Sequence, residues 1–368
     1  MVIGLLRSLR TAILLGMPFT VTSVPPPASA DAEPSPDVLA LVAVETAHHQ
    51  RLFGHRDLVH NAEAITVGLL HQERTAKARL LVRDDEGRAV GAAHVSMPRQ
   101  DNEHVAYWFP SWDPGSGAAE AEVYDALWAA SLPILAEHGR TSIQSWVMHP
   151  APTDPSSATW LTPRTGSGRV AQDDRARWFA GSGFVLEQVE LYSVLRVAEA
   201  TLPPTGATAY RIRSWVGATP PELLGGMARL YNRMSVDTPH GGIDQDEEHW
   251  DEAEVVADDE RAALIGTMRL TTVALDPDGA PVAYTVIDHQ PDQPHSADQD
   301  DTLVHGDHRG HGLGLAVKAA NLALLREHLP RVERVHTWNA AENTHMLAIN
   351  RALGFTEAGS QGGWQLRR

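Results

Sequence analysis

The sequence predicts an α+β protein of two similar halves, each starting with a β-hairpin and continuing through alternating short strands and helices. Strand-forming runs flank a turn signal in both halves, at 78–96 and at 269–288, and such an arrangement predicts a hairpin. A Gly-Phe pair then follows a helix-like segment at equivalent places, 183–184 and 354–355. A pattern that returns along the chain indicates a duplication.

Composition limits the classes of partner. The chain has 368 residues, 43% of them hydrophobic, which is enough for more than one core. It carries 30 basic and 47 acidic residues, so a net charge of −17 disfavours nucleic acid and anionic membranes and favours a cationic ligand. The absence of Cys excludes disulfides, a thiolate zinc site and a Cys nucleophile. We therefore expect a cationic ligand, and the sequence does not define an oligomeric state.

Residues 1–36 are set aside as a disordered or signal-like leader. Arg7 and Arg10 precede an apolar run, and the pattern Ala28-Ser29-Ala30 follows it, as in a secretory signal peptide. A disordered extension or an upstream start codon are the alternatives. The run is too short and too interrupted by Pro to span a membrane.

The remaining chain divides at a segment without apolar periodicity. We predict a first domain at 37–198, a linker at 199–208 and a second domain at 209–368. An acidic tract at 244–260, with ten acidic residues among 17, is an ordinary solvated surface or a rim that attracts an amine.

Glycines in the second domain lie between a predicted strand and a predicted helix. The strand covers 301–305, and apolar residues at 313, 317, 320 and 324 define one helix face. Between them stands Arg309-Gly310-His311-Gly312-Leu313-Gly314. The first N–H groups of a helix favour an anion, and glycines let the backbone approach a phosphate, so this loop predicts a pyrophosphate cradle. A plain tight turn is the alternative.

The histidines at 305, 308 and 311 could suggest a metal site in the same loop. A glycine-rich turn does not hold three imidazoles on one side, and no carboxylate pattern completes the set. We therefore expect no metal.

Together with the downstream stretch NAAENTHMLAINRALGF (339–355), the loop resembles the two signatures of the GNAT N-acyltransferase superfamily. The resemblance implies two tandem domains, each a twisted mixed, mostly antiparallel sheet flanked by helices. It implies acetyl-CoA as the acyl donor, an amine as the acceptor and, because acyl-CoA is a cytoplasmic metabolite, a cytoplasmic protein. The first half has Asp113 and no Arg at the equivalent loop (108–123), which implies a degenerate domain without CoA.

The resemblance also assigns cofactor-binding residues. The amides of Gly310, His311, Gly312, Leu313 and Gly314 would hold the pyrophosphate with help from Arg309. Val304 would pair its backbone with the pantetheine arm. Asn343 matches an Asn that touches the CoA arm, and a helix N-cap is its alternative role.

Catalytic and acceptor residues are implied less directly. Asp301 is the preferred general base and His305 the second choice, since a strand puts both on one face. The family's Tyr acid is replaced by Asn350, so water, the amine's own proton or another Tyr such as Tyr231 must protonate the thiolate. Asp237 and Glu247, with Glu248, are candidates to hold an ammonium group; surface solvation is their alternative role.

These inferences predict an N-acetyltransferase that acts on a primary amine of a small cationic acceptor, such as an amino sugar, an aminoglycoside-like compound, a polyamine or an amino-acid derivative. A catalytically silent acyl-CoA-binding or regulatory protein is the alternative, because of Asn350 and the degenerate first half. A secreted protein with another role would follow only from residues 1–30.

Overall fold

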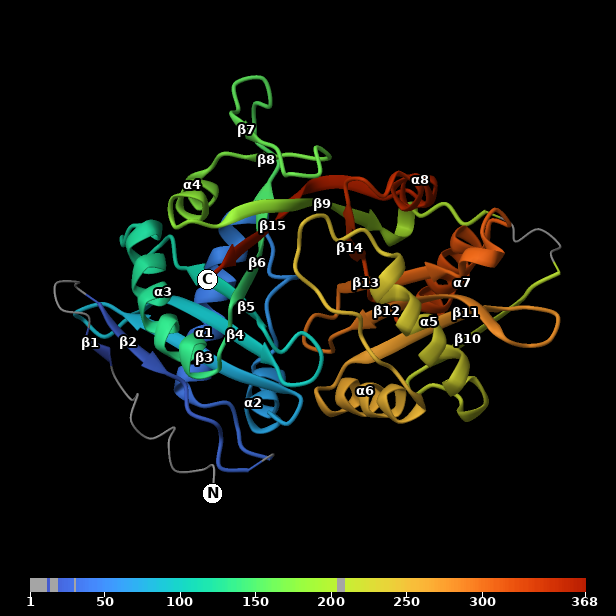
Figure 1. Ribbon diagram of the computed structural model, residues 1–368, viewed down its shortest axis with the longest axis horizontal. Coiled ribbons are helices and arrows are strands. Elements are labelled where there is room, and N and C mark those ends of the chain that lie inside the picture. Colours follow the sequence, from blue (N-terminus) through green and yellow to red (C-terminus); the bar gives the residue numbers. More distant parts are fainter. Residues whose placement is uncertain (1–11, 14–18, 30, 204–208) are drawn as a thin grey trace. The chain divides into compact units, whose positions relative to one another are not determined.

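The computed structural model describes residues 12–13, 19–29, 31–203 and 209–368 (Figure 1). The described chain forms two compact units. Unit 1 contains residues up to Val189 together with Gly241–Gln245 and Ser360–Arg368, and unit 2 contains Glu190–His240 and Asp246–Gly359.

The helices and strands follow each other in a similar order in the two units. Up to the division within β9 they are β1 (Ala12–Ile13), β2 (Thr20–Ser23), α1 (Pro36–Phe53), α2 (Ala62–Leu70), β3 (Thr75–Arg83), β4 (Ala89–Pro98), β5 (Val105–Trp112), α3 (Glu120–Glu137), β6 (Ser142–Pro150), β7 (Trp160–Leu161), β8 (Val170–Ala171), α4 (Asp174–Gly181) and β9 (Val185–Arg196). The rest are β10 (Arg211–Val216), α5 (Leu224–Asp237), α6 (Glu252–Leu264), β11 (Met268–Leu275), β12 (Pro281–His289), β13 (Ser296–Val304), α7 (Leu313–His328), β14 (Arg334–Ala340), α8 (Thr344–Leu353) and β15 (Thr356–Arg367), with short 3-10 turns at Val197–Glu199, Pro221–Leu223 and Gly306–His308.

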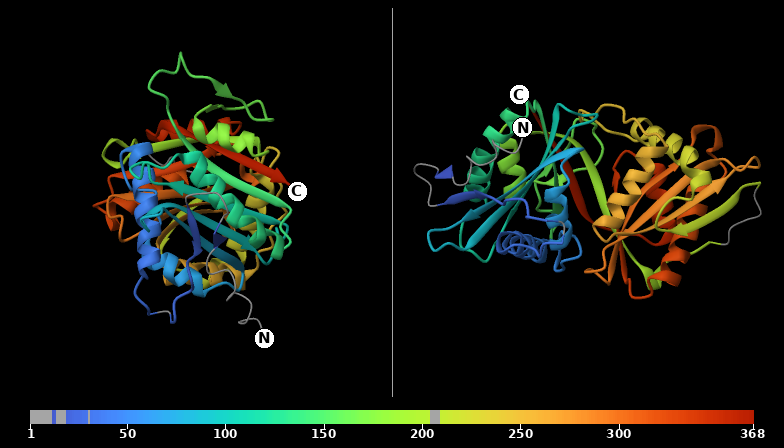
Figure 2. Two further views of the ribbon diagram at one scale, coloured as in Figure 1. Left: turned by 90° about the vertical axis from the view of Figure 1, so that its left-hand side faces the viewer. Right: turned by 90° about the horizontal axis from the view of Figure 1, so that it is seen from below.

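The sheet of unit 1 has helices on both faces (Figure 2). Its strand order is β1-β2-β3-β4-β5-β6-β15, and β5 and β6 pair in parallel. Successive side chains of a strand point to opposite faces. Leu80 and Val82 of β3 accordingly pack into the core with α3 and α4, whereas Leu81 packs with α1 and α2.

The sheet of unit 2 follows the same plan, with strand order β9-β14-β13-β12-β11-β10. Val273 and Leu275 of β11 pack on the side of α5 and α6, and Leu270 and Ala274 pack on the side of α7. β13 and β14 pair in parallel, while the β10–β11, β11–β12 and β12–β13 pairs are antiparallel. The predicted fold class, two tandem domains with mixed, mostly antiparallel sheets and flanking helices, is confirmed.

The structure differs from the expected division of the chain in two ways. Residues 19–24 belong to the fold, because β2 pairs with β3 and because Phe19, Val21 and Val24 are buried. The boundary between the halves is also not a single cut, since β9 and β15 both cross from one unit to the other. Most of the predicted signal-like run and residues 204–208 of the predicted linker lie outside the described residues.

No helix in the described ranges combines the length and the apolar character that a membrane span requires.

Candidate functional site

The candidate site lies on β13 of unit 2, at a β-bulge that contains two adjacent aspartates. The register between β12 and β13 shifts between Thr285 and Ile287, so that Asp300 and Asp301 together oppose one residue of β12. A bulge bends its strand and redirects side chains, and such irregularities often stand beside functional sites. The strand therefore presents carboxylates at a point where its pairing is already irregular.

β13 and β14 separate beside this bulge. Their parallel pairing covers only Ser296–Asp298 on β13 and Arg334–His336 on β14. Backbone N–H and C=O groups are obligatory hydrogen-bonding groups, so a strand edge without a neighbouring strand can pair with an extended ligand. The second half of β13, which leads to Val304, therefore has an edge that an extended ligand could pair with.

Asp301 is the carboxylate whose environment fits acid–base chemistry. Its Oδ2 atom accepts a hydrogen bond of 3.1 Å from the hydroxyl of Tyr284, which is buried. The pKa of Asp301 is raised to about 6, chiefly by burial; the Tyr284 hydrogen bond opposes the rise, and the charge of Glu248 contributes to it. A carboxylate with this pKa is ionised at neutral pH and still accepts a proton readily.

Further aromatic side chains pack next to Tyr284, the hydrogen-bond donor to Asp301. The ring of Tyr231 lies 5.1 Å from that of Tyr284 and 4.9 Å from that of Trp250, centroid to centroid. The indole N–H of Trp250 donates to Oε2 of Glu248 at 2.9 Å. Aromatic faces and carboxylates both attract organic cations, so these residues form an environment suited to an ammonium group. We call Tyr231, Glu248, Trp250, Tyr284 and Asp301 the aromatic–acid cluster.

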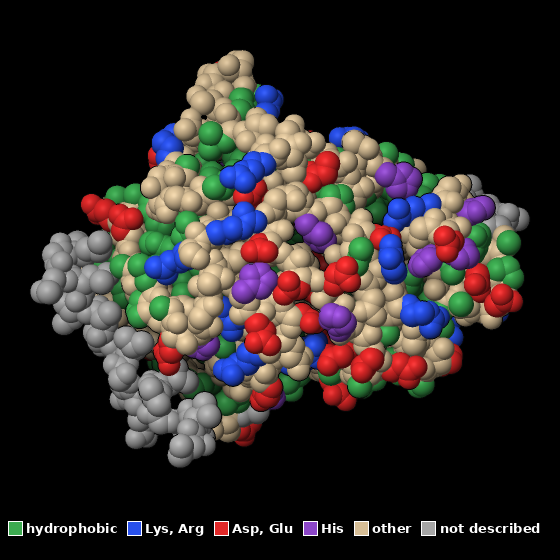
Figure 3. Space-filling view, in the orientation of Figure 1, with side chains coloured by type: hydrophobic (Ala, Val, Ile, Leu, Met, Phe, Trp, Pro, Cys, Tyr) green, Lys and Arg blue, Asp and Glu red, His purple; other side chains and the backbone are tan. Residues whose placement is uncertain are grey.

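Part of the acidic tract has a structural role instead. Arg269 pairs with both carboxylate oxygens of Asp288 at 3.0 Å, and with Oδ2 of Asp258 at 2.5 Å. Asp259 accepts the backbone N–H of Thr219 at 2.7 Å. These contacts tie α6 to β11 and β12, and acidic side chains gather over the region of α6 (Figure 3). The tract is therefore neither a simple solvated face nor a single amine-attracting rim.

The predicted phosphate loop forms a left-handed turn ahead of α7. Gly310 and Gly312 have φ values of 83° and 72°, a conformation that other residues rarely adopt. Gly312 is the N-cap of α7, and no side chain caps the helix. The first N–H groups of a helix lack intrahelical partners, so the start of α7 is suited to an anion. Close packing explains Gly314, where a Cβ would stand 3.0 Å from Ile349.

Arg309 lies at the mouth of this loop and is held by an acidic side chain. Its guanidinium donates to Oδ2 of Asp237 at 2.9 Å and to the carbonyl of Val304 at 3.2 Å. Asp237, at the end of α5, also pairs with Arg233. The structure thus brings the predicted acceptor residue Asp237 to the phosphate loop, where two arginines share its charge.

The two asparagines singled out in the sequence lie at the start of α8 and within it. Asn343 is the N-cap of the helix, and its side-chain oxygen accepts the N–H of Met346 at 3.1 Å. A role in touching the CoA arm would therefore use the side-chain nitrogen. Asn350 is buried and donates to the side-chain oxygen of Asn339 at 2.5 Å. An amide in this place does not supply an acidic proton.

Two other predicted residues lie away from Asp301. His305 directly follows β13, and its Nδ1 atom accepts the N–H of Asp307 at 3.4 Å. Four residues of strand separate it from Asp301 by about 13 Å, which puts it at the phosphate loop. The side chain of Glu247 is exposed, whereas its neighbour Glu248 joins the aromatic–acid cluster.

In the equivalent loop of unit 1, side chains of the loop accept hydrogen bonds from its own backbone N–H groups. Oδ1 of Asp113 accepts the N–H of Gly115 at 2.8 Å, and the hydroxyl of Ser116 accepts that of Ala118 at 3.2 Å. The first turn of α3 then carries Glu120 and Glu122. Carboxylates at a helix start repel an incoming phosphate, so this loop lacks the features that suit the loop of unit 2 to an anion.

Sequence reasoning missed Tyr284 and Glu190. Tyr284 lies within an ordinary strand pattern, and only the pairing of β12 with β13 brings it to Asp301. Glu190 lies opposite Ala340 at the end of β14. Burial raises the pKa of Glu190 to about 7, and the nearby charge of Glu342 contributes. Neither residue has a local sequence signal.

The fold has close counterparts among solved structures. A tandem GNAT protein from the clavulanic acid biosynthesis pathway, solved without AcCoA, is 23% identical with a TM-score of 0.72, over 94% of this chain and 98% of that one. A GCN5-related N-acetyltransferase from Sphaerobacter thermophilus is 13% identical with a TM-score of 0.59, over 94% and 95%. No family model and no curated protein matches the sequence.

Proposed function

Because the chain has the tandem GNAT fold, we propose that it is an N-acyltransferase that moves an acetyl group from acetyl-CoA to a primary amine of a small cationic acceptor. The observation that carries the proposal is the combination, in one unit, of an uncapped glycine-rich helix start and a carboxylate with a raised pKa. In the equivalent loop of unit 1, side chains already accept hydrogen bonds from the backbone N–H groups, so we expect one acetyl-CoA per chain.

The donor would bind along β13 and the start of α7. The amides of Gly310 to Gly314, with His311 and Leu313 between them, would hold the pyrophosphate, and Arg309 would add its charge. The arm would pair with the backbone at Val304 and touch Asn343. Val304 is three residues from Asp301, about 10 Å along a strand, so the arm would lead its thioester toward the bulge.

Asp301 is the proposed general base. The acceptor nitrogen attacks the thioester carbonyl carbon, its proton passes to Asp301 directly or through water, and the carbon–sulfur bond breaks. The leaving thiolate then takes a proton from water, from the amine or from a Tyr such as Tyr231. His305 is the second candidate base, but its place at the phosphate loop favours it less.

The aromatic–acid cluster supports an amine acceptor. Glu248 and the rings of Tyr231 and Trp250 offer charge and π faces to an ammonium ion. Glu247 and Asp237 could add to the acidic rim, although Asp237 is already shared by Arg309 and Arg233. Amino sugars, aminoglycoside-like compounds, polyamines and amino-acid derivatives all present such a group. We also propose a cytoplasmic location, where acetyl-CoA is made.

A catalytically silent acyl-CoA-binding protein is the second candidate. Asn350, buried and bonded to Asn339, favours it because the site then lacks the Tyr that other members of the fold use as an acid.

Calorimetric titration of acetyl-CoA tests whether the glycine-rich loop binds acetyl-CoA, as both candidate functions require, or is a tight turn that binds no ligand. We expect one site per chain, and we expect its loss in Arg309→Glu/Gly312→Asp, which puts two negative charges into the loop. Asp113→Asn, in the loop of unit 1, is the matched control and should leave the titration unchanged. Two sites would contradict a silent first unit. No binding by folded protein would contradict both candidate functions.

Release of free CoA with a panel of amines then tests catalysis. Release that depends on an amine and is lost in Asp301→Asn supports the acyltransferase. Binding of acetyl-CoA without release for any amine of the panel would favour the silent protein.

A further inference from the structure

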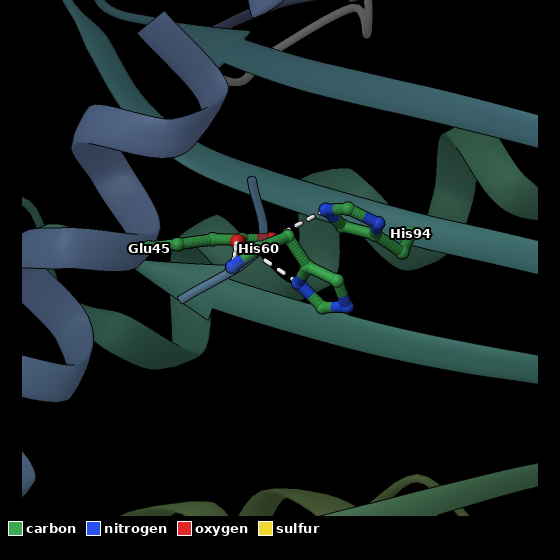
Figure 4. A group of neighbouring side chains, drawn as sticks. All are labelled: Glu45, His60 and His94. Atoms are coloured by element: carbon green, nitrogen blue, oxygen red, sulfur yellow. Dashed lines mark hydrogen bonds and ion pairs between the residues drawn. The ribbon is translucent and has the colours of Figure 1, made fainter. Parts of the chain in front are cut away.

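Three ligand-type side chains of unit 1 converge outside the site described above. Glu45 comes from α1, His60 from the segment between α1 and α2, and His94 from β4 (Figure 4). Oε2 of Glu45 lies 3.1 Å from Nδ1 of His60, and Oε1 of Glu45 lies against Nε2 of His94. All of the potential ligand atoms lie within 4.8 Å of one another.

The carboxylate of Glu45 is buried among these ligand-type side chains. Glu45 and His94 are both buried, and Oε1 of Glu45 faces Nε2 of His94. Arg79, the nearby buried cation, donates its guanidinium hydrogens to the carbonyls of Ala78 and Val95. Buried charges in proteins are paired or coordinate metals.

Metal binding would use the neutral imidazoles and the ionised carboxylate, which are the forms of these groups that coordinate metals.

We propose that Glu45, His60 and His94 bind a divalent transition-metal ion, and that zinc is the ion they fit best. Two imidazoles and one carboxylate form a known three-ligand zinc set, which leaves a fourth position open. In a tetrahedral site two ligand atoms at about 2.0–2.1 Å from zinc lie about 3.4 Å apart, so closure needs a movement of roughly 1–1.5 Å. The side chain of His60, 59% exposed and outside any helix or strand, can make that movement.

His49 is the candidate for the fourth position. It follows Glu45 by one helical turn on α1, so both side chains point to the same side. Its Nδ1 atom is buried and has no hydrogen-bond partner among the described residues.

The ion would cross-link α1, the segment before α2 and β4, and would therefore stabilise unit 1. The expectation of no metal rested on the loop histidines of the second half, which are a different set. The alternative is a carboxylate–imidazole network that holds the same elements together without an ion.

Calorimetric titration of zinc chloride into the chelator-treated full chain tests the proposal. We expect one ion per chain, and binding at least about tenfold weaker in His60→Ala and in Glu45→Gln. His60 is exposed, so its variant should fold, and circular dichroism can verify this. Cobalt(II) added to the wild type should give visible absorption bands of a low-coordinate site, and these should be lost in His60→Ala.

Two matched variants control for other histidines. His71→Ala removes an exposed histidine that lies 3.9 Å from Glu73 in the same unit, and it should bind zinc like the wild type. His308→Ala tests the loop of unit 2 and should also leave binding unchanged. The proposal is overturned if the folded wild type binds no zinc, if His60→Ala and Glu45→Gln bind as tightly as the wild type, or if His308→Ala abolishes binding.

Discussion

The hydroxyl of Tyr284 should set the pH at which the proposed enzyme becomes active. It donates to the carboxylate of Asp301, so Tyr284→Phe removes a bond that favours the ionised form, and the pKa of Asp301 should rise above about 6. A hydrogen bond to a charged group contributes about 1.5–3 kcal/mol. At 3.1 Å this bond is long for O–H···O, so we take the lower limit, which corresponds to about one pKa unit.

The expected change is largest in mildly acidic solution. With a pKa near 6 half of Asp301 is ionised at pH 6, and with a pKa near 7 only about a tenth is ionised. kcat/KM should therefore fall about fivefold at pH 6 and about twofold at pH 7, with no change on the plateau at pH 9. The assay is CoA release at saturating acetyl-CoA across this pH range.

Tyr231→Phe is the matched control, because the Tyr231 ring packs against that of Tyr284, whereas the hydroxyl that donates to Asp301 is that of Tyr284. It should leave the fall of kcat/KM at acid pH (the acid limb) in place, even if the plateau changes because Tyr231 is one of the candidate proton donors to the thiolate. An acid limb at the same pH in Tyr284→Phe and wild type would refute the reasoning. So would an acid limb that persists in Asp301→Asn.

Two further predictions concern the core of unit 1 and the acceptor. Gly91→Ala should lower the free energy of unfolding by about 1–3 kcal/mol, because the new Cβ would stand 2.2 Å from Val123, and thermal denaturation can measure this. Gly181→Ala, with no atom within 4 Å of its Cβ, is the control, and equal melting temperatures would contradict the packing argument. Glu248→Gln should raise KM for a cationic amine by about tenfold and move the acid limb to lower pH, since its charge raises the pKa of Asp301. An unchanged KM would exclude Glu248 from the acceptor site.

The fold was largely predictable because its signals are local. The turn residues at 84–87 and 276–279 lie between strand-forming runs, and both hairpins form as expected. The strand–glycine–helix order around 301–328 is likewise set by neighbouring residues. The return of β15 to unit 1 was not predictable, because strand pairing depends on residues far apart in the sequence.

The same distinction between local signals and long-range contacts explains which parts of the candidate site were predictable. The phosphate loop has a contiguous motif, and Asp301 lies on the strand that leads to it. The Tyr284 contact depends on the register of two strands, and the association of Glu248 with Trp250 depends on how the acidic tract folds back. The cluster of Glu45, His60 and His94 has no short motif, because its members come from three separate elements.

The passage of β15 into unit 1 has a consequence for synthesis on the ribosome. Trp364 is buried in the core of unit 1, with its ring 5.7 Å from that of Phe179. Residue 364 emerges long after Val189, and at about 5–20 residues per second the delay is on the order of 10–30 s. During that interval the nascent first unit lacks a strand and leaves an aromatic surface uncovered, which is the kind of surface that chaperones bind. Unit 2, whose residues end at Gly359, can close before unit 1 does.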